Sequence, residues 1–185
     1  MDDFEILNLM IQSTAKVELV DSGSSKPKVV LAEADLYAVT ILGMPDRENV
    51  TIVKGDAFEA PKQIFNGKNG ECKQADFIIV ARLDQRRKYV IYIEMKASSK
   101  TSKEWEIIQQ LQGTQCFFTY FQAVGKVFWQ TKNFLNGYQP RFVSFRNIGL
   151  PKQPIHKENL IHDCPERMWK INCAKSIQFN QLIGK

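Results

Sequence analysis

Two apolar segments joined by a polar turn decide the fold of this chain. The first is Asp76-Phe-Ile-Ile-Val-Ala, the turn is Asp84-Gln-Arg-Arg-Lys88, and the second is Tyr89-Val-Ile-Tyr-Ile-Glu94-Met-Lys96. β-Branched and aromatic side chains occur on both faces, as in the central strands of a covered sheet. The sequence therefore predicts a β-hairpin, with strands over 73–82 and 88–97, that carries two carboxylates and a lysine on otherwise buried strands.

The numbering of this hairpin indicates which side chains share a face. A turn centred near Arg86 places Asp76 opposite Lys96 and Ile78 opposite Glu94. Side chains alternate between faces with a period of two, so Asp76, Glu94 and Lys96 are expected on one face. Opposite neighbours then lie about 5 Å apart at Cβ. A register shift of one residue would move Asp76 to the other face.

Charges on buried strands are costly unless they are paired or bind a ligand. Mg²⁺ prefers hard oxygen ligands and keeps several waters, so one or two carboxylates suffice to hold it. Asp76 and Glu94 are the candidate metal ligands, with the Met95 carbonyl as a third. Lys96 would orient or help to deprotonate an attacking water, or stabilise charge on a phosphate. The alternative is an ordinary salt bridge between Lys96 and one carboxylate at a strand end.

Ala75-Asp76, then Glu94-Met95-Lys96, then a helix with Gln109-Gln110-Leu111 resemble the PD-(D/E)xK nuclease superfamily over roughly residues 71–123. Ala75 stands where the motif has proline, a substitution that the superfamily tolerates. The resemblance implies an α/β fold with a mixed central β-sheet flanked by helices, a restriction-endonuclease-like core. It also implies that Asp76 and Glu94 bind Mg²⁺, or Mn²⁺, and that Lys96 is the catalytic lysine.

Many members of the superfamily place an acidic residue on a helix before the motif. Residues 29–42 are apolar with Glu33 embedded and predict such a helix, ended by Gly43-Met44-Pro45, so Glu33 is the first candidate. Glu59 and Glu71 are alternatives, and a surface glutamate is an equally good interpretation of each.

Some members direct a glutamine from the following helix at the site. Gln110 fits, because it lies fourteen residues beyond Lys96, although a solvated helix glutamine is the alternative interpretation. The Gln-xxx-Tyr pattern of exonuclease-like members is absent, since Thr114 stands four residues after Gln110. The sequence therefore favours an endonuclease over an exonuclease.

Elements outside the hairpin follow from hydrophobic periodicity and breakers. The clearest is a helix over 103–124, because Ile107, Leu111, Thr114, Phe118 and Phe121 recur at three- and four-residue steps. Further expectations are a short helix over 4–11, strands over 16–20, 50–53, 126–129 and 141–145, and a strand or short helix over 169–179. Residues 149–185 form a loop-rich C-terminal part with three prolines.

Composition points to a soluble cytoplasmic protein. The 185 residues suit one domain over 1–185, with 44% hydrophobic and 24% charged residues. The acidic start does not resemble a secretory signal, and apolar runs such as 77–81 are too short to cross a bilayer. Four cysteines without a CxxC pair indicate reduced thiols.

The positive charge is concentrated in the part that contains the hairpin. Residues 1–71 hold 7 Lys/Arg and 12 Asp/Glu, whereas residues 72–185 hold 18 and 8. A basic surface around a carboxylate cluster suits a polyanionic substrate, although basic residues also simply solvate a surface. Arg86, Arg87 and Lys88 in the turn are candidate contacts to a phosphate backbone, or else a solvated hairpin end.

Two histidines and two cysteines raise the alternative of a zinc site. They are His156, His162, Cys164 and Cys173, with five, one and eight residues between them. These spacings match no compact zinc module, so loop histidines and buried thiols are the better interpretation.

Together these observations favour a metal-dependent endonuclease that hydrolyses DNA, of the restriction, repair or phage-defence type by resemblance. Cutting both strands of a duplex is easiest with two symmetry-related sites, so a homodimer is compatible with this hypothesis. RNA remains an alternative substrate. The competing hypothesis is a non-catalytic nucleic-acid-binding or protein-interaction module that keeps the nuclease fold. No membrane partner is expected.

Overall fold

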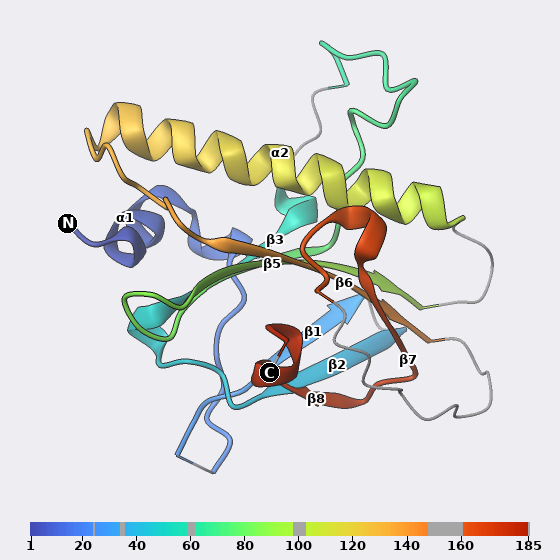
Figure 1. Cartoon of the computed structure of the whole chain (residues 1–185), viewed down its shortest axis with the longest axis horizontal. Coiled ribbons are helices and arrows are strands. Elements are labelled where there is room, and N and C mark those ends of the chain that lie inside the picture. The colour runs from blue at the N-terminus through green and yellow to red at the C-terminus, as the bar shows by residue number, and fades with distance from the viewer. Residues whose placement is uncertain (24, 34–35, 59–61, 98–102, 148–160, 185) are drawn as a thin grey trace.

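Two β-sheets build the protein, whose computed structural model describes residues 1–23, 25–33, 36–58, 62–97, 103–147 and 161–184 (Figure 1). The larger sheet has five strands in the order β3-β4-β5-β6-β7. β3 and β5 each pair antiparallel with β4, whereas β6 pairs parallel with both β5 and β7. The strand bounds are Val50–Lys54, Phe77–Arg82, Lys88–Lys96, Gln139–Arg146 and Trp169–Asn172 for β3 to β7.

The smaller sheet corrects the helix predicted over residues 29–42. β1 (Val29–Glu33) and β2 (Tyr37–Leu42) pair antiparallel, and β8 (Ser176–Gln178) pairs parallel with β2. Along β1 buried and exposed residues alternate, with Val29 and Leu31 inside and Val30 outside. β-Branched residues fit such a half-buried pleated surface well, and here the period of two prevails over the helical pattern. Gly43 therefore follows a strand rather than a helix.

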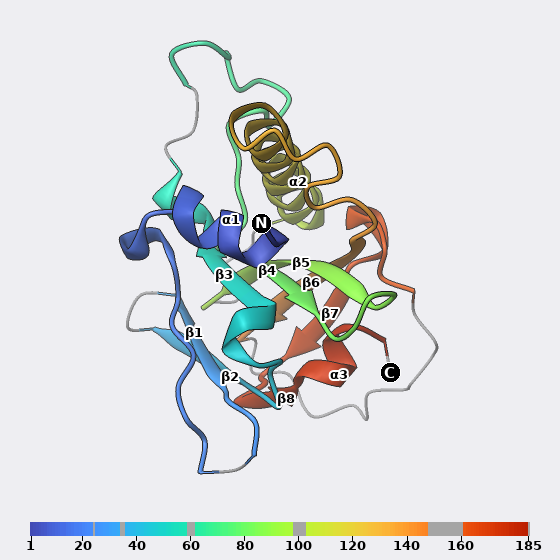
Figure 2. The same ribbon diagram turned by 90° about the vertical axis from the view of Figure 1, so that its left-hand side faces the viewer.

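Helices cover one face of the larger sheet and the smaller sheet covers the other (Figure 2). α1 and α2 lie on the first face, whereas β1, β2 and β8 lie on the second. The helix bounds are Asp3–Met10 for α1, Glu104–Phe128 for α2 and Phe179–Leu182 for α3. Short 3₁₀ turns span Ser13–Ala15, Arg47–Asn49, Gly55–Ala57 and Pro165–Arg167, named η1 to η4. The fold is thus α/β with mixed sheets flanked by helices. No helix within the described ranges has the length and apolar character needed to cross a membrane.

The stripe predicted on the long helix is the face that α2 buries. Its five predicted members are all buried, and they pack in the core between α2 and the larger sheet. Tyr92 of β5 meets this core, with its ring edge-on to Phe118 and stacked on Phe142. The helix runs on to Phe128, so the strand predicted over 126–129 is wrong. Full burial of each large apolar side chain contributes about 1.5–3 kcal/mol to folding.

Two other predictions for the N-terminal part differ in outcome. The short helix over 4–11 is confirmed as α1, whose apolar residues Phe4, Ile6 and Leu7 are buried. The strand predicted over 16–20 is wrong, because Lys16 and Val20 make only isolated bridges, to Val53 and Lys28.

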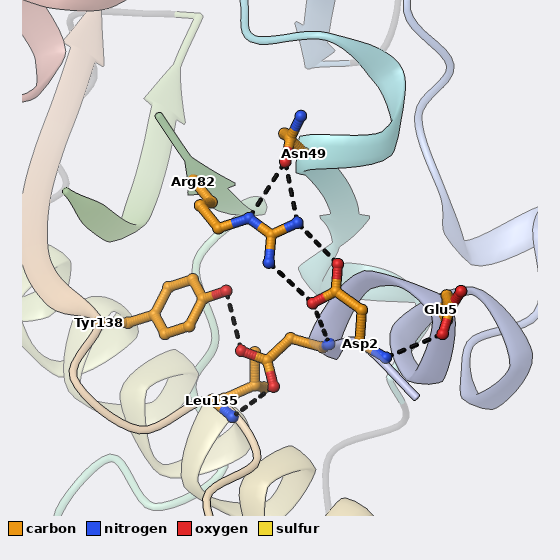
Figure 3. Close-up of polar contacts among 7 residues, drawn as sticks. Asp2, Glu5, Asn49, Arg82, Leu135 and Tyr138 are labelled. Atoms are coloured by element: carbon orange, nitrogen blue, oxygen red, sulfur yellow. Dashed lines mark hydrogen bonds and ion pairs between the residues drawn. The ribbon is translucent and has the colours of Figure 1, made fainter. Parts of the chain in front are cut away.

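A charged cluster holds α1 against the larger sheet (Figure 3). Arg82, at the end of β4, donates from its two Nη atoms to the two carboxylate oxygens of Asp2, over 2.8 and 2.6 Å. Asn49 Oδ1 accepts from the same guanidinium. Asp3 accepts from Leu135 N and from the Tyr138 hydroxyl. The cluster joins the start of α1 to η2, to the end of β4 and to the segment before β6. It lies at the opposite end of β4 from Asp76.

The connection from β5 through α2 to β6 decides where the functional residues gather. Two adjacent parallel strands need a long crossover, which α2 provides. The C-terminal ends of β5 and β6 therefore meet at one edge of the sheet, and Glu104 at the start of α2 reaches this edge by pairing with Lys170 of β7.

Candidate functional site

The β4–β5 register brings Asp76 opposite Glu94. Phe77 pairs with Ile93, so the predicted pairing of Asp76 with Lys96 is wrong by two residues. The reason is the turn, which Leu83 N closes on Arg87 O and which therefore centres on residue 85 rather than on Arg86. A shift of two residues leaves every side chain on its face. Glu94 and Lys96 lie on the α2 side of the sheet, in phase with Tyr92, whereas Asp76 stands just before β4 and directs its carboxylate at the backbone of β5.

Backbone contacts on both sides fix the position of Asp76. Its Oδ2 accepts from Met95 N at 2.6 Å, and its carbonyl accepts from Gly55 N at 2.6 Å. Gly55 is required by this approach, because a Cβ there would lie 1.8 Å from the Ala75 carbonyl oxygen. On the other side, Ala75 N donates to the buried Thr114 hydroxyl of α2 at 2.6 Å. Asp76 is thus held between η3 and α2 with its Oδ2 directed at β5.

Glu94 is the most buried charged group of the site. Its side chain is 0% exposed, and its Oε1 forms an ion pair with Lys96 Nζ. Its Oε2 has no hydrogen-bond partner among the described residues. Burial first, and the charge of Asp76 second, raise the pKa of Glu94 to about 8. Burial also raises the pKa of Asp76 to about 6, against the lowering effect of the Met95 N–H.

Lys96 is the cation of this cluster. Burial lowers its pKa, but the neighbouring carboxylates, Glu94 above all, raise it by more, and the net pKa lies above the usual value. Lys96 therefore carries its positive charge at neutral pH. An ammonium in this state donates hydrogen bonds and stabilises nearby negative charge.

Two further carboxylates act on the cluster through their charge. Glu33 lies on strand β1 rather than on the predicted helix, and its charge raises the pKa of both Asp76 and Glu94. Glu33 Oε2 is buried and has no partner among the described residues. Asp56 of η3 also raises the pKa of Asp76. Sequence reasoning missed Asp56, although an aspartate two residues after an apolar strand was a signal that could have found it.

Other predicted site residues lie elsewhere. Gln110 donates to the carbonyl of Gln74 over 3.4 Å, so it contacts the segment that leads to Asp76 rather than the carboxylates. Glu71 is exposed and accepts from Asn69 N. Glu59 lies outside the described residues.

The basic turn is remote from the carboxylates. Lys88 begins the nine-residue strand β5 and Lys96 ends it, a span of about 26 Å at the usual rise of a strand. Asp84 accepts from the backbone N–H groups of Arg86 and Arg87 and pairs with the Arg87 guanidinium, which organises the turn locally. The three basic residues of the turn therefore do not belong to this site.

Strand β6 adds two polar residues that sequence reasoning missed. Ser144 pairs with Glu94 and Arg146 pairs with Lys96 in the parallel register. Both lie on the α2 face, because the alternate residues Val143 and Phe145 face the other core. The signal in the sequence was weak: two polar residues in alternate positions near the end of an apolar run.

The candidate zinc residues do not assemble into a centre within the described ranges. His162 is buried, with Nε2 2.7 Å from the Leu182 carbonyl, whereas Cys173 is exposed. His156 lies outside the described residues. No group of three or more His, Cys, Asp or Glu suited to a metal was found in the parts of the chain that the structure describes.

Two neighbouring carboxyl groups suit a hard divalent cation that keeps part of its water shell. The unpartnered Oε2 of Glu94 fits this role, and a bound cation would offset the cost of ionising the buried pair Asp76 and Glu94. Comparison of the chain with protein-family models, curated proteins and solved structures found no match.

Proposed function

We propose that this protein is a Mg²⁺- or Mn²⁺-dependent nuclease that hydrolyses phosphodiester bonds in DNA, with Asp76, Glu94 and Lys96 as its working residues. One observation carries the proposal: Glu94 is fully buried opposite Asp76 and has an oxygen without a partner among the described residues. A structural ion pair alone would need one carboxylate for one lysine. Here two carboxyl groups lie beside a single lysine, and a bound cation would replace the proton that burial keeps on Glu94 at neutral pH.

The arrangement of elements supports the finer assignment to a restriction-endonuclease-like core. A hairpin carries the acidic residues at its open end, an amphipathic helix follows directly, and the next strand returns parallel beside the second hairpin strand. This agrees with the mixed, helix-flanked sheet that the motif resemblance implies. The endonuclease mode and the restriction, repair or phage-defence setting rest on that resemblance.

The residues of the chain have distinct roles in this proposal. Asp76 and Glu94 supply oxygen ligands, and the Met95 N–H holds Asp76 Oδ2 in place. The divalent ion, when bound, polarises a phosphate oxygen and lowers the pKa of a water. Lys96 is charged and donates hydrogen bonds, so it orients the attacking water or stabilises negative charge on the phosphate.

Plasmid cleavage in Mg²⁺, in Mn²⁺ and in EDTA tests this function. Wild-type protein should cut only with a metal, and Lys96→Ala and Glu94→Gln should not cut while retaining a cooperative unfolding transition. Lys132→Ala, at an exposed lysine after α2, is the matched control and should cut like the wild type. Undiminished cleavage by Lys96→Ala and Glu94→Gln would overturn the assignment.

Two further comparisons define the substrate and the partner. Rates on duplex DNA, single-stranded DNA and RNA should rank duplex DNA first. A wild-type protein that binds DNA but never cuts it would support the non-catalytic binding module instead. Sedimentation of the protein with a DNA duplex should show two copies per duplex if both strands are cut by a homodimer.

A further inference from the structure

Arg146 is the last residue of β6, and its backbone is fixed on both sides. Asn147 N donates to the Lys96 carbonyl at 2.8 Å, and Cys173 N donates to the Arg146 carbonyl at 2.7 Å. These bonds extend the pairing of β5, β6 and β7 past the end of the strand. The Arg146 side chain therefore leaves the sheet next to that of Lys96, on the face that carries Glu94 and Ser144.

The guanidinium of Arg146 is short of acceptors. Its Nε donates to the Ser144 hydroxyl over a long 3.5 Å, and its buried Nη2 has no partner among the described residues. An arginine stays charged at every pH at which proteins fold. A buried donor that is both charged and unpaired costs more than a neutral one.

Two carboxylates in the neighbourhood of Arg146 already have cations. Glu94 is paired with Lys96. Glu104 lies close enough for Arg146 to lower its pKa, but its carboxylate contacts Lys170 Nζ at 2.6 Å. The positive charge of Arg146 is thus left for an anion from outside the described chain.

We infer that Arg146 binds a phosphate of the nucleic-acid backbone next to the Asp76–Glu94–Lys96 cluster. A guanidinium matches phosphate with two parallel N–H donors, which an ammonium does not. Arg146 and Lys96 stand on adjacent strands, about 5 Å apart at the backbone. One backbone phosphate on Arg146 therefore places the neighbouring phosphodiester at Lys96. This inference rests on the proposed nuclease function and assigns the residue that positions its substrate.

Binding of a short fluorescein-labelled DNA duplex, with Ca²⁺ in place of Mg²⁺ and no product formed, tests the inference. Arg146→Gln should weaken binding about 10- to 100-fold, the range for losing a hydrogen bond to a charged group. The slope of log affinity against log salt should also become shallower by about 1, because one phosphate contact is lost. Lys132→Gln removes the same charge at an exposed lysine and should change neither quantity appreciably.

Arg146→Lys separates the contact from a structural role. The variant keeps the positive charge, so its salt slope should match that of the wild type. It loses the two parallel N–H donors of the guanidinium, so the KM for cleavage should rise more than kcat falls. If Arg146→Gln and Arg146→Lys both keep the affinity and KM of the wild type, and the wild type cleaves DNA, the inference is overturned. The proposed nuclease function is then unaffected. A wild-type protein that neither binds nor cuts DNA would overturn both.

Discussion

Asp76 Oδ2 accepts a 2.6 Å hydrogen bond from the backbone N–H of Met95, the residue between Glu94 and Lys96. Because Met95 directs its own side chain into the opposite core, its backbone is fixed by packing. The bond thus ties the first acidic residue to the centre of the Glu94-Met95-Lys96 segment. This tie holds the two carboxyl groups together, and the first two predictions follow from their burial and, for Glu94, from the nearby charge of Asp76.

The metal-free protein should lose stability as the pH rises from about 5 to about 8. Glu94 has a pKa of about 8 in the folded state and Asp76 about 6, above the values of 4.5 and 3.8 for unperturbed groups. Between these values the folded state binds more protons than the unfolded state, so the free energy of unfolding falls with rising pH. Urea unfolding in EDTA across this pH range measures the slope.

Glu94→Gln supplies the control for this pH dependence. The variant has no buried carboxyl to ionise at residue 94, so most of the decline in stability should disappear and the variant should exceed the wild type at pH 9. A wild-type stability that stays flat or rises between pH 5 and 8 would contradict the shared burial of the two carboxyl groups. A slope unchanged in Glu94→Gln would assign the effect to other residues.

Mg²⁺ and Mn²⁺ should raise the melting temperature, and more at pH 8 than at pH 5. Protons compete with the metal for the carboxylates, so binding strengthens once Asp76 and Glu94 ionise. Metal at 100 times its Kd stabilises the fold by about 2.7 kcal/mol. Thermal unfolding with and without metal should show this shift in the wild type and lose it in Asp76→Asn and Glu94→Gln. Glu71→Gln, at an exposed carboxylate, should keep the full shift.

The hairpin and the long helix could be predicted because their information is local. The apolar runs on either side of the turn at residues 84–88 specify two buried strands, and the spacing from Ile107 to Phe121 specifies one helical face. The predicted sharing of a face by Glu94 and Lys96 agrees with the structure, since both belong to β5 and an error of two residues in register preserves the face.

The rest of the site depends on contacts between segments distant in sequence. Glu33 was assigned to a helix because a short apolar run does not distinguish a helix from a strand by periodicity alone. The pairing of β3 with β4 brings Asp56 near the carboxylates, and the pairing of β5 with β6 brings Arg146 beside Lys96. No local sequence pattern encodes which strands become neighbours. Local patterns therefore predicted the hairpin that carries the candidate residues but not the segments that surround it.

Thr114→Val should destabilise the protein by about 1–3 kcal/mol, although valine has nearly the same shape. The Thr114 hydroxyl accepts from the buried Ala75 N at 2.6 Å and donates to the Gln110 carbonyl at 3.0 Å, and valine leaves that N–H without a partner. Cleavage should fall as well, because Ala75 precedes Asp76. Thr119→Val is the matched control, since this exposed threonine donates to the carbonyl four residues earlier and accepts from no backbone N–H among the described residues. Equal unfolding midpoints for the two variants would contradict this role.

Asp2→Asn should lower stability at neutral pH without changing cleavage. Its hydrogen bond with Arg82 is the main cause that holds the pKa of Asp2 below its usual value, so the ion pair stabilises the fold above pH 4 and its contribution disappears as the pH falls through the lowered pKa. Asparagine is an equally good helix N-cap, so the variant isolates the charge at the start of α1.

For a partly exposed pair the expected loss is about 1 kcal/mol at pH 7. Urea unfolding at pH 7 and pH 3 should show a larger difference between wild type and Asp2→Asn at the higher pH. Asp21→Asn removes the partner of Arg47 in a pair whose carboxylate is 92% exposed, and it should leave stability unchanged at both pH values. Cleavage should persist in both variants, because Arg82 and Asp76 lie at opposite ends of β4. Loss of cleavage in Asp2→Asn at full stability would instead show that the α1 end of the sheet takes part in the reaction.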